Sequence, residues 1–170
     1  MGTCKTVNWK RLARKGFKVK RNQNMVLFLR SWLPVVFPAH LGVYGRSGKG
    51  IEVGGYVADP CNKFHHPGKS ADIYLSASRE TDLKLGNALF EMFAEHPYSL
   101  GVEQVIWNRR LWLDGKDAPG CPRPFSPNAG MKAHDDHIHV TFTEESAIEW
   151  GSSTLMYLLS MIRSEIFGGK

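Results

Sequence analysis

A histidine-rich stretch near the C-terminal end constrains this chain more than any other feature. Residues 133–142 read AHDDHIHVTF, so three histidines fall within six residues and lead directly into a β-branched and aromatic run. That run favours a strand at about 137–142. Residues two apart on a strand point to the same face, so the imidazoles of His137 and His139 are expected side by side.

A second cluster lies upstream. Residues 64–75 read FHHPGKSADIYL, and the end of this segment, 71–75, favours a buried strand. Together the two clusters hold five of the seven histidines. Between His65 and Asp72 lies a Pro67-Gly68 turn, which can fold one side chain back beside the other. The two clusters are therefore expected to meet at one site.

The residue types in these clusters are those of a catalytic zinc site. Such a site takes three protein ligands of histidine or carboxylate type and leaves a fourth position to water. We expect His65, Asp72 and His139 to converge on one Zn²⁺ ion. His137, on the strand face of His139, suits the general base that moves the proton of the attacking water.

Several alternatives remain open at this point. His66 could replace His65 as the ligand, and a Cys61 thiolate would instead indicate a closed structural zinc site. Three further residues are candidates to orient a ligand or to bind substrate: His134, Asp135 and Asp136. The two aspartates also suit simple loop or capping roles, and a purely structural histidine cluster is a further interpretation.

The remaining pattern predicts helices and strands interspersed along one domain. Apolar residues at helical spacing predict helices over 25–33, 85–93 and 155–162. The apolar stripe of the first helix includes Trp32. Pro34 and Pro38 are expected to end that helix. Pro97 should stop the second, and residues 102–107 favour a strand. The fold class is therefore α+β, with a small central antiparallel sheet flanked by helices.

Residues 114–130 are rich in proline and glycine and predict a long loop. A loop of that length beside a site often forms a lid or a substrate wall.

Charge and composition bound the partners. Residues 5–21 contain eight basic residues and no acidic one, so residues 1–23 are expected to form a basic arm or helix and residues 24–170 a single zinc peptidase domain that ends in a C-terminal helix. The net charge of +6 favours an anionic partner, which nucleic acid, a membrane surface or an acidic wall polymer would each satisfy. No signal peptide or membrane-spanning segment is recognisable, so synthesis in a cytosol is expected.

The motifs resemble a known group of enzymes. His-x6-Asp followed much later by His-x-His is similar to the signature of the LAS zinc metallopeptidases, which include lysostaphin, D-Ala-D-Ala carboxypeptidases and the hedgehog signalling domain. The fuller pattern His134-x-x-His137-x-His139 is most similar to penicillin-insensitive murein endopeptidases and related phage and actinobacterial cell-wall hydrolases. The segments 65–72 and 101–107 also resemble theirs, and the resemblance spans about residues 24–145.

The resemblance implies a role for each residue. His65, Asp72 and His139 would bind zinc, His137 would assist catalysis, and His134 would lie in the active site. The segment 44–47 loosely resembles one that places an arginine near the site, so Arg46 would bind a substrate carboxylate or polarise its carbonyl; a solvated loop arginine is the alternative.

The leading hypothesis is a zinc peptidase, expected to be a monomer, that cleaves peptide cross-links in peptidoglycan as an endopeptidase or carboxypeptidase. It would act on the cell wall after release during phage lysis, as an endolysin, or as an effector exported by a dedicated machine. A metal-dependent nuclease or phosphoesterase is a second hypothesis, since His139-Val140-Thr141 matches one His-x-Thr unit, although no second unit is present. A third is a non-catalytic zinc module that recognises the wall. We do not expect a nucleic-acid partner.

Overall fold

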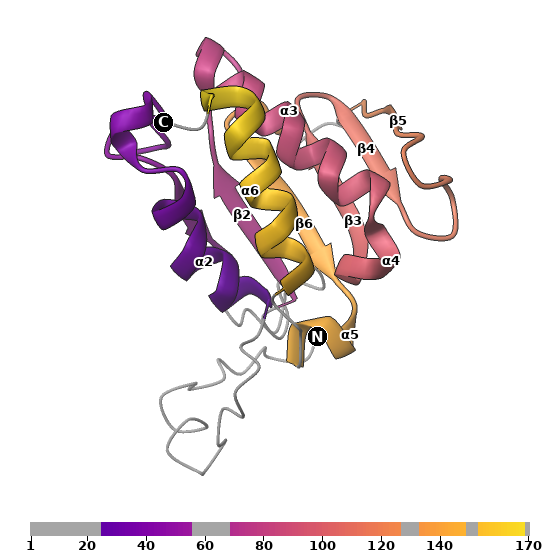
Figure 1. The fold of residues 1–170 in the computed structure, drawn as a ribbon. Helices are drawn as coiled ribbons and strands as arrows, with labels where there is room; N and C mark the ends of the chain where they lie inside the picture. The colour runs from indigo at the N-terminus through magenta and orange to yellow at the C-terminus, as the bar shows by residue number, and fades with distance from the viewer. Residues whose placement is uncertain (1–24, 56–68, 127–132, 149–152, 169–170) are drawn as a thin grey trace, which may run out of the picture.

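The computed structural model describes residues 25–55, 69–126, 133–148 and 153–168. Helices and strands alternate irregularly along these segments (Figure 1). The elements are α2 (Met25–Val36), the 3-10 helix η1 (Ala39–Leu41), β1 (Glu52–Gly54), β2 (Ser70–Tyr74), α3 (Glu80–Glu95), α4 (Pro97–Leu100), β3 (Val102–Trp107), β4 (Arg110–Leu113), β5 (Arg123–Pro124), β6 (His137–Phe142), α5 (Glu144–Ile148) and α6 (Ser153–Phe167).

The strands of the described residues form one six-stranded sheet in the order β1-β2-β6-β3-β4-β5. Every neighbouring pair is antiparallel. Strand β6 lies between β2 and β3, so the two histidine-bearing segments of the chain become neighbours in the sheet. The predicted α+β fold with a small antiparallel sheet is confirmed.

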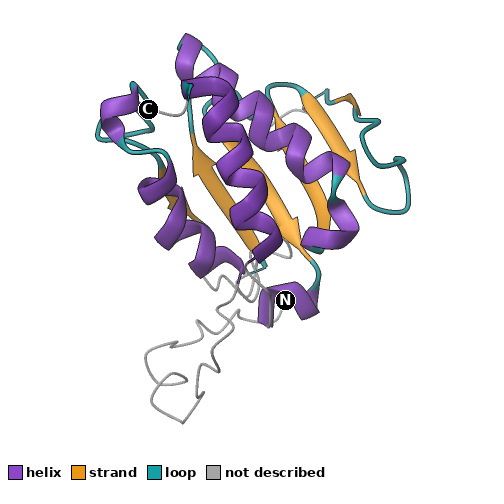
Figure 2. Ribbon diagram, viewed as in Figure 1, coloured by secondary structure: helices purple, strands orange, loops and turns teal. Residues whose placement is uncertain are grey.

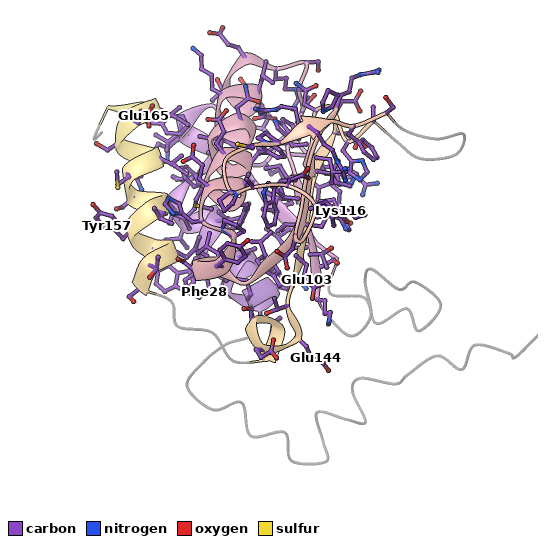
Figure 3. All side chains as sticks on the ribbon, turned by 90° about the vertical axis from the view of Figure 1, so that its right-hand side faces the viewer. Phe28, Glu103, Lys116, Glu144, Tyr157 and Glu165 are labelled. Atoms are coloured by element: carbon purple, nitrogen blue, oxygen red, sulfur yellow. The ribbon has the colours of Figure 1, made fainter. Side chains whose placement is uncertain are left out.

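Helices cover one face of this sheet. Figure 2 shows α2, α3 and α6 in front of the strands, and the side view in Figure 3 separates a helical layer from the sheet layer. Tyr157 and Glu165 project from α6 away from the sheet (Figure 3). Among the described residues, the opposite face of the sheet carries no helical layer.

The core lies between the two layers. Ile138, Val140 and Phe142 alternate along β6 and are fully buried. Phe142 meets Phe93 of α3 edge to face, with ring centroids 6.1 Å apart. Residues that alternate along a strand share a face, so β6 directs these three side chains to the helices and His137, His139 and Thr141 to the other face.

Helix α2 confirms the predicted stripe and corrects two details. The helix continues through Pro34 to Val36, and Phe37 N–H still donates to the Leu33 carbonyl at 2.9 Å. Pro34 removes one helical hydrogen bond but does not end the helix, which stops only two residues later. Trp32 remains 40% exposed because its large indole extends past the stripe, where it contacts Phe28.

Helix α3 packs closely on β3. A Cβ at Gly86 would lie 2.3 Å from the Trp107 ring, so only glycine allows this approach. The Trp107 indole N–H donates to Asn87 Oδ1 at 3.1 Å. As predicted, α3 ends before Pro97, which then occupies the first turn of α4.

Strands β3 and β4 form a hairpin that the sequence analysis did not predict. Asn108 and Arg109 connect them with φ angles of 43° and 62°. Two successive positive φ values are typical of the type I′ hairpin turn, for which Asn-Gly is the usual signal. Strand β5 then pairs with β4 inside the stretch predicted as a loop.

One further prediction is confirmed, and several others concern residues that the structure does not describe. Helix α6 confirms the predicted C-terminal helix, and Leu155, Leu159 and Ile162 are buried. The basic arm, His65, His66 and Cys61 lie outside the described residues, while Cys121 is a free, exposed thiol. No helix within the described segments is both long and apolar enough to cross a membrane.

Candidate active site

Asp72 and His139 form the centre of the candidate site. The register of β2 and β6 pairs these two residues directly, although they lie 67 positions apart in the sequence. Directly opposed residues project from the same face of a sheet. His139 Nδ1 lies 2.9 Å from Asp72 Oδ1, and the His139 side chain is 8% exposed. The structure therefore joins one predicted ligand from each histidine cluster.

His137 lies beside this pair. It is two residues from His139 and opposite Tyr74 in the sheet. Its Nε2 is 3.9 Å from Asp72 Oδ1, and its Nδ1 is 2.6 Å from Asp136 Oδ1. The two ring nitrogens thus have different partners, and the Asp136 contact turns Nε2 toward the site.

His134 approaches from a constrained turn. Its φ is 53°, a left-handed conformation that non-glycine residues seldom adopt. Asn108 N–H donates to its carbonyl at 2.7 Å, and Ala77 N–H donates to the Asp135 carbonyl at 2.7 Å. The His134 ring centroid lies 4.7 Å from that of His137 and 5.9 Å from that of His139. All three histidines of the second cluster therefore meet.

Within the described residues, the long proline-rich loop contacts this group through Phe125. Phe125 N–H donates to the Arg109 carbonyl at 2.7 Å, which continues the pairing of β5 with β4. The Phe125 ring then meets His134 edge to face, with centroids 5.6 Å apart. The described part of the loop therefore forms a wall beside His134.

A pocket of about 390 Å³ adjoins Asp72 and His137. It is lined by Gly45, Arg46, Asp72, Tyr74, Leu75, Ser76, Arg79, Asp136 and His137. Its two arginines are cationic, whereas Asp72, Asp136 and His137 supply carboxylate and imidazole groups. The pocket therefore presents oppositely charged groups to a polar ligand.

Arg46 reaches the pocket across Tyr74. Its guanidinium carbon lies 5.1 Å from the centroid of the Tyr74 ring, a cation–π geometry. The Tyr74 ring lies over Gly54, where a Cβ would come within 2.9 Å of the Tyr74 hydroxyl oxygen. Gly54 is opposite Asp72 in the sheet, so its missing side chain leaves room for Tyr74 beside the site.

Buried Asp82 connects the loop of Arg46 to the end of β2. Its two carboxylate oxygens accept the Tyr44 N–H at 3.0 Å and the Ser76 N–H at 3.1 Å. Arg79 donates to the Gly45 carbonyl at 3.3 Å, and Ser47 bonds Glu52. These contacts fix the position of the pocket wall that carries Arg46.

Two hydroxyl groups extend the site into the sheet. Thr141 Oγ1 lies 3.2 Å from His139 Nε2 and 2.9 Å from Ser70 Oγ. Ser70 is fully buried and Thr141 is 6% exposed. Asp72 and Thr141 therefore contact opposite edges of the His139 ring.

The donor set fits a metal ion in part. Asp72 and His139 offer a carboxylate oxygen and an imidazole nitrogen from adjacent strands, and both are ligand types of zinc. The predicted third ligand, His65, falls outside the described residues, and within those residues no group of three metal-ligating side chains is found.

Sequence reasoning missed several residues of the site. Tyr74 and Ser70 lie two residues on either side of Asp72, so strand alternation could have found both. Thr141 was considered only as part of a His-x-Thr unit, although the same alternation places it on the face of His139. Asp82 and Arg79 lie on or beside α3 and approach the site only through tertiary packing. No local pattern identifies them.

Comparisons with known proteins add one finding. Neither the curated proteins nor the solved structures contain a significant match to this chain. A family model described as VldE, C-terminal domain, matches residues 36–137. The matched range includes Arg46, Asp72, His134 and His137 and ends two residues before His139. Because it covers more than half of the 170 residues, the chain belongs to the family of the VldE C-terminal domain.

Proposed function

We propose that this chain is a zinc-dependent peptidase that cleaves peptide bonds in the cross-links of peptidoglycan. The observation that carries the proposal is the cross-strand pair of Asp72 and His139, with His137 beside it at the edge of a polar pocket. The resemblance of the histidine and aspartate motifs to the LAS metallopeptidases supports the same reaction class.

His65, Asp72 and His139 are the proposed zinc ligands. When bound, the ion would lower the pKa of a coordinated water toward about 7 and polarise the substrate carbonyl. The donor types fit this role, since a carboxylate and imidazoles with a position left to water make a catalytic rather than a closed site. Metal analysis of the purified chain should find one zinc per molecule.

His137 is the proposed general base. Asp136 accepts a hydrogen bond from the Nδ1–H of His137, which leaves the Nε2 lone pair directed to the side of Asp72. A base in this position can take a proton from the attacking water and later give it to the leaving amine. His134 lies against His137 and would contact the substrate or the reacting groups.

Arg46 is proposed to bind the substrate on the other side of the pocket. Its guanidinium is held over Tyr74 and can donate to a carboxylate or a carbonyl oxygen. Stem peptides of peptidoglycan carry both groups. The net charge of +6 also supports an acidic wall polymer as partner. Release during phage lysis and export as an effector are both compatible with this substrate.

The phosphoesterase alternative has less support. In that reading, His139 and Thr141 would both face the substrate as parts of a His-x-Thr unit. Instead, Thr141 is buried and its hydroxyl oxygen lies within hydrogen-bond distance of both Ser70 and His139. The described arrangement therefore favours Thr141 as a partner of His139.

The decisive experiment is digestion of purified sacculi followed by mass spectrometry of the released muropeptides. The zinc-loaded chain should convert cross-linked species into smaller ones, with one water added for each bond cut. The His137→Ala variant serves as the matched control. An unchanged muropeptide profile from zinc-loaded protein, across sacculi of different cross-link chemistry, would rule out the proposed substrate.

A further inference from the structure

We propose that Thr141 and Ser70 are positioning residues that set the orientation of the His139 ring for metal binding. The inference rests on the proposed function, because it assigns these hydroxyl groups a role toward a zinc ligand. It starts from a continuous row of contacts, in which Asp72, His139, Thr141 and Ser70 follow one another at 2.9, 3.2 and 2.9 Å.

The register of the sheet explains why this row forms. Asp72 is opposite His139, and Ser70 is opposite Thr141. The four side chains are therefore two neighbouring cross-strand pairs on the same face of β2 and β6. Side chains at such positions are close enough to interact directly and diagonally. The His139 ring is therefore held from both edges, by Asp72 at Nδ1 and by Thr141 at Nε2.

A hydroxyl group suits the Nε2 side in either protonation pattern of the ring. Thr141 can donate to an unprotonated Nε2 or accept from a protonated one, since a hydroxyl both donates and accepts. If Nδ1, the ring nitrogen on the Asp72 side, were to hold the metal ion, Nε2 would carry the proton. Thr141 would then accept that N–H and could direct its own hydroxyl proton to Ser70.

The burial of the row indicates that it orients the ring rather than binding substrate. Ser70 is fully buried and Thr141 nearly so, whereas the pocket lies on the side of Asp72 and His137. Partners of this kind, which hold the second nitrogen of a metal-bound histidine, typically change metal affinity by about 10- to 100-fold when removed.

Zinc affinity of the full chain, measured by competition with a chromophoric chelator, tests the inference. Thr141→Val keeps the shape of the side chain and should weaken zinc binding by about 10- to 100-fold. Thr141→Ser restores the hydroxyl and should recover most of the affinity. Ser70→Ala should cause a smaller loss, because it acts through Thr141. Thr154→Val, the same change at an exposed position of α6, should have no effect.

The outcomes separate this inference from the proposed function. If the unmodified chain binds zinc and Thr141→Val binds it equally well, the positioning role is wrong and the zinc site stands. If the unmodified chain binds no zinc, both fail. Nitrogen-15 spectra of the His139 ring in the metal-free chain give a second readout. Thr141→Val should shift the Nε2 resonance and Thr141→Ser should restore it, whereas identical spectra would contradict the contact.

Discussion

The two faces of strand β6 differ in chemistry and in their partners. On one face, Ile138, Val140 and Phe142 are fully buried against the helices. On the other, His137, His139 and Thr141 contact polar side chains, chiefly those of β2. Because the residues of the two faces alternate along one strand, the apolar core fixes the backbone from which the polar groups project.

The comparison implies that stability and chemistry can be changed separately. Removing a polar side chain from the site face takes away a ligand or a proton acceptor but leaves the apolar core filled. Removing an apolar side chain from the helical face opens a cavity but leaves the histidines in place. Substitutions on the two faces should therefore produce opposite patterns of lost activity and lost stability.

The largest expected effect is the loss of the metal. Asp72→Ala and His139→Ala each remove a proposed ligand, so either variant should release the zinc and lose wall hydrolysis completely. Metal analysis after dialysis, together with the sacculus digestion, measures both. Gln104→Ala, a change on the same sheet face next to Thr141, is the matched control and should retain zinc. Stoichiometric zinc in both ligand variants would contradict the assignment.

The next effect isolates proton transfer from metal binding. His137→Ala should keep one zinc per chain and slow hydrolysis by about 10²- to 10⁴-fold, the usual contribution of a general acid–base group. Steady-state rates on a defined muropeptide and metal content of the same sample check this. Asp136→Asn should cause a smaller decrease, because it changes the partner of Nδ1 and keeps the base. Undiminished hydrolysis by His137→Ala would show that His137 is not the general base.

The third effect falls on the helical face. Phe142→Ala should lower the free energy of unfolding by about 3–5 kcal/mol, because it removes a fully buried ring and leaves a cavity against Phe93. Denaturant unfolding of the metal-free chain gives this value. The folded fraction should retain the zinc affinity of the unmodified chain. A large loss of zinc affinity without a decrease in the free energy of unfolding would show that the two faces do not act separately.

The sequence predicted the fold class because the main elements have strong local signals. Helices α3 and α6 were identified from the spacing of apolar residues, and strand 137–142 from its run of β-branched and aromatic residues. The hairpin of β3 and β4 was missed because Asn108 and Arg109 adopt positive φ without the glycine that usually marks such a turn. Pro34 misled the prediction because a proline was taken to end the helix at once.

Strand periodicity predicted which residues of the candidate site share a face within one strand, but not which strands pair with each other. The spacing of His137 and His139 placed both imidazoles on one face. That Asp72 lies opposite His139 depends on which strands become neighbours, and no local rule determines a pairing across 67 residues. The residue types of a zinc site predicted that the two would meet, and the register of β2 and β6 brings Asp72 and His139 together. The part played by Asp82 in holding the Arg46 loop depends entirely on tertiary packing.

The smallest expected effect concerns Asp82, which connects the helical layer to the site face. This carboxylate belongs to α3, is fully buried and accepts the N–H groups of Tyr44 and Ser76. Asp82→Ala leaves both donors without their acceptor and should lower the free energy of unfolding by about 1–3 kcal/mol, the cost of an unsatisfied buried polar group. Denaturant unfolding measures the change.

Asp82 also tests whether the separation of the two faces is complete. Tyr44 immediately precedes the loop that carries Arg46, and Ser76 lines the pocket. A looser loop should raise KM while kcat and zinc content stay close to those of the unmodified chain, because His137 and the ligands are not displaced. Asp82→Asn keeps one acceptor oxygen, so its KM should lie between those of the unmodified chain and of Asp82→Ala. A decrease in kcat with unchanged KM would instead show that α3 positions the reacting groups themselves, so that the helical layer acts on the chemistry directly.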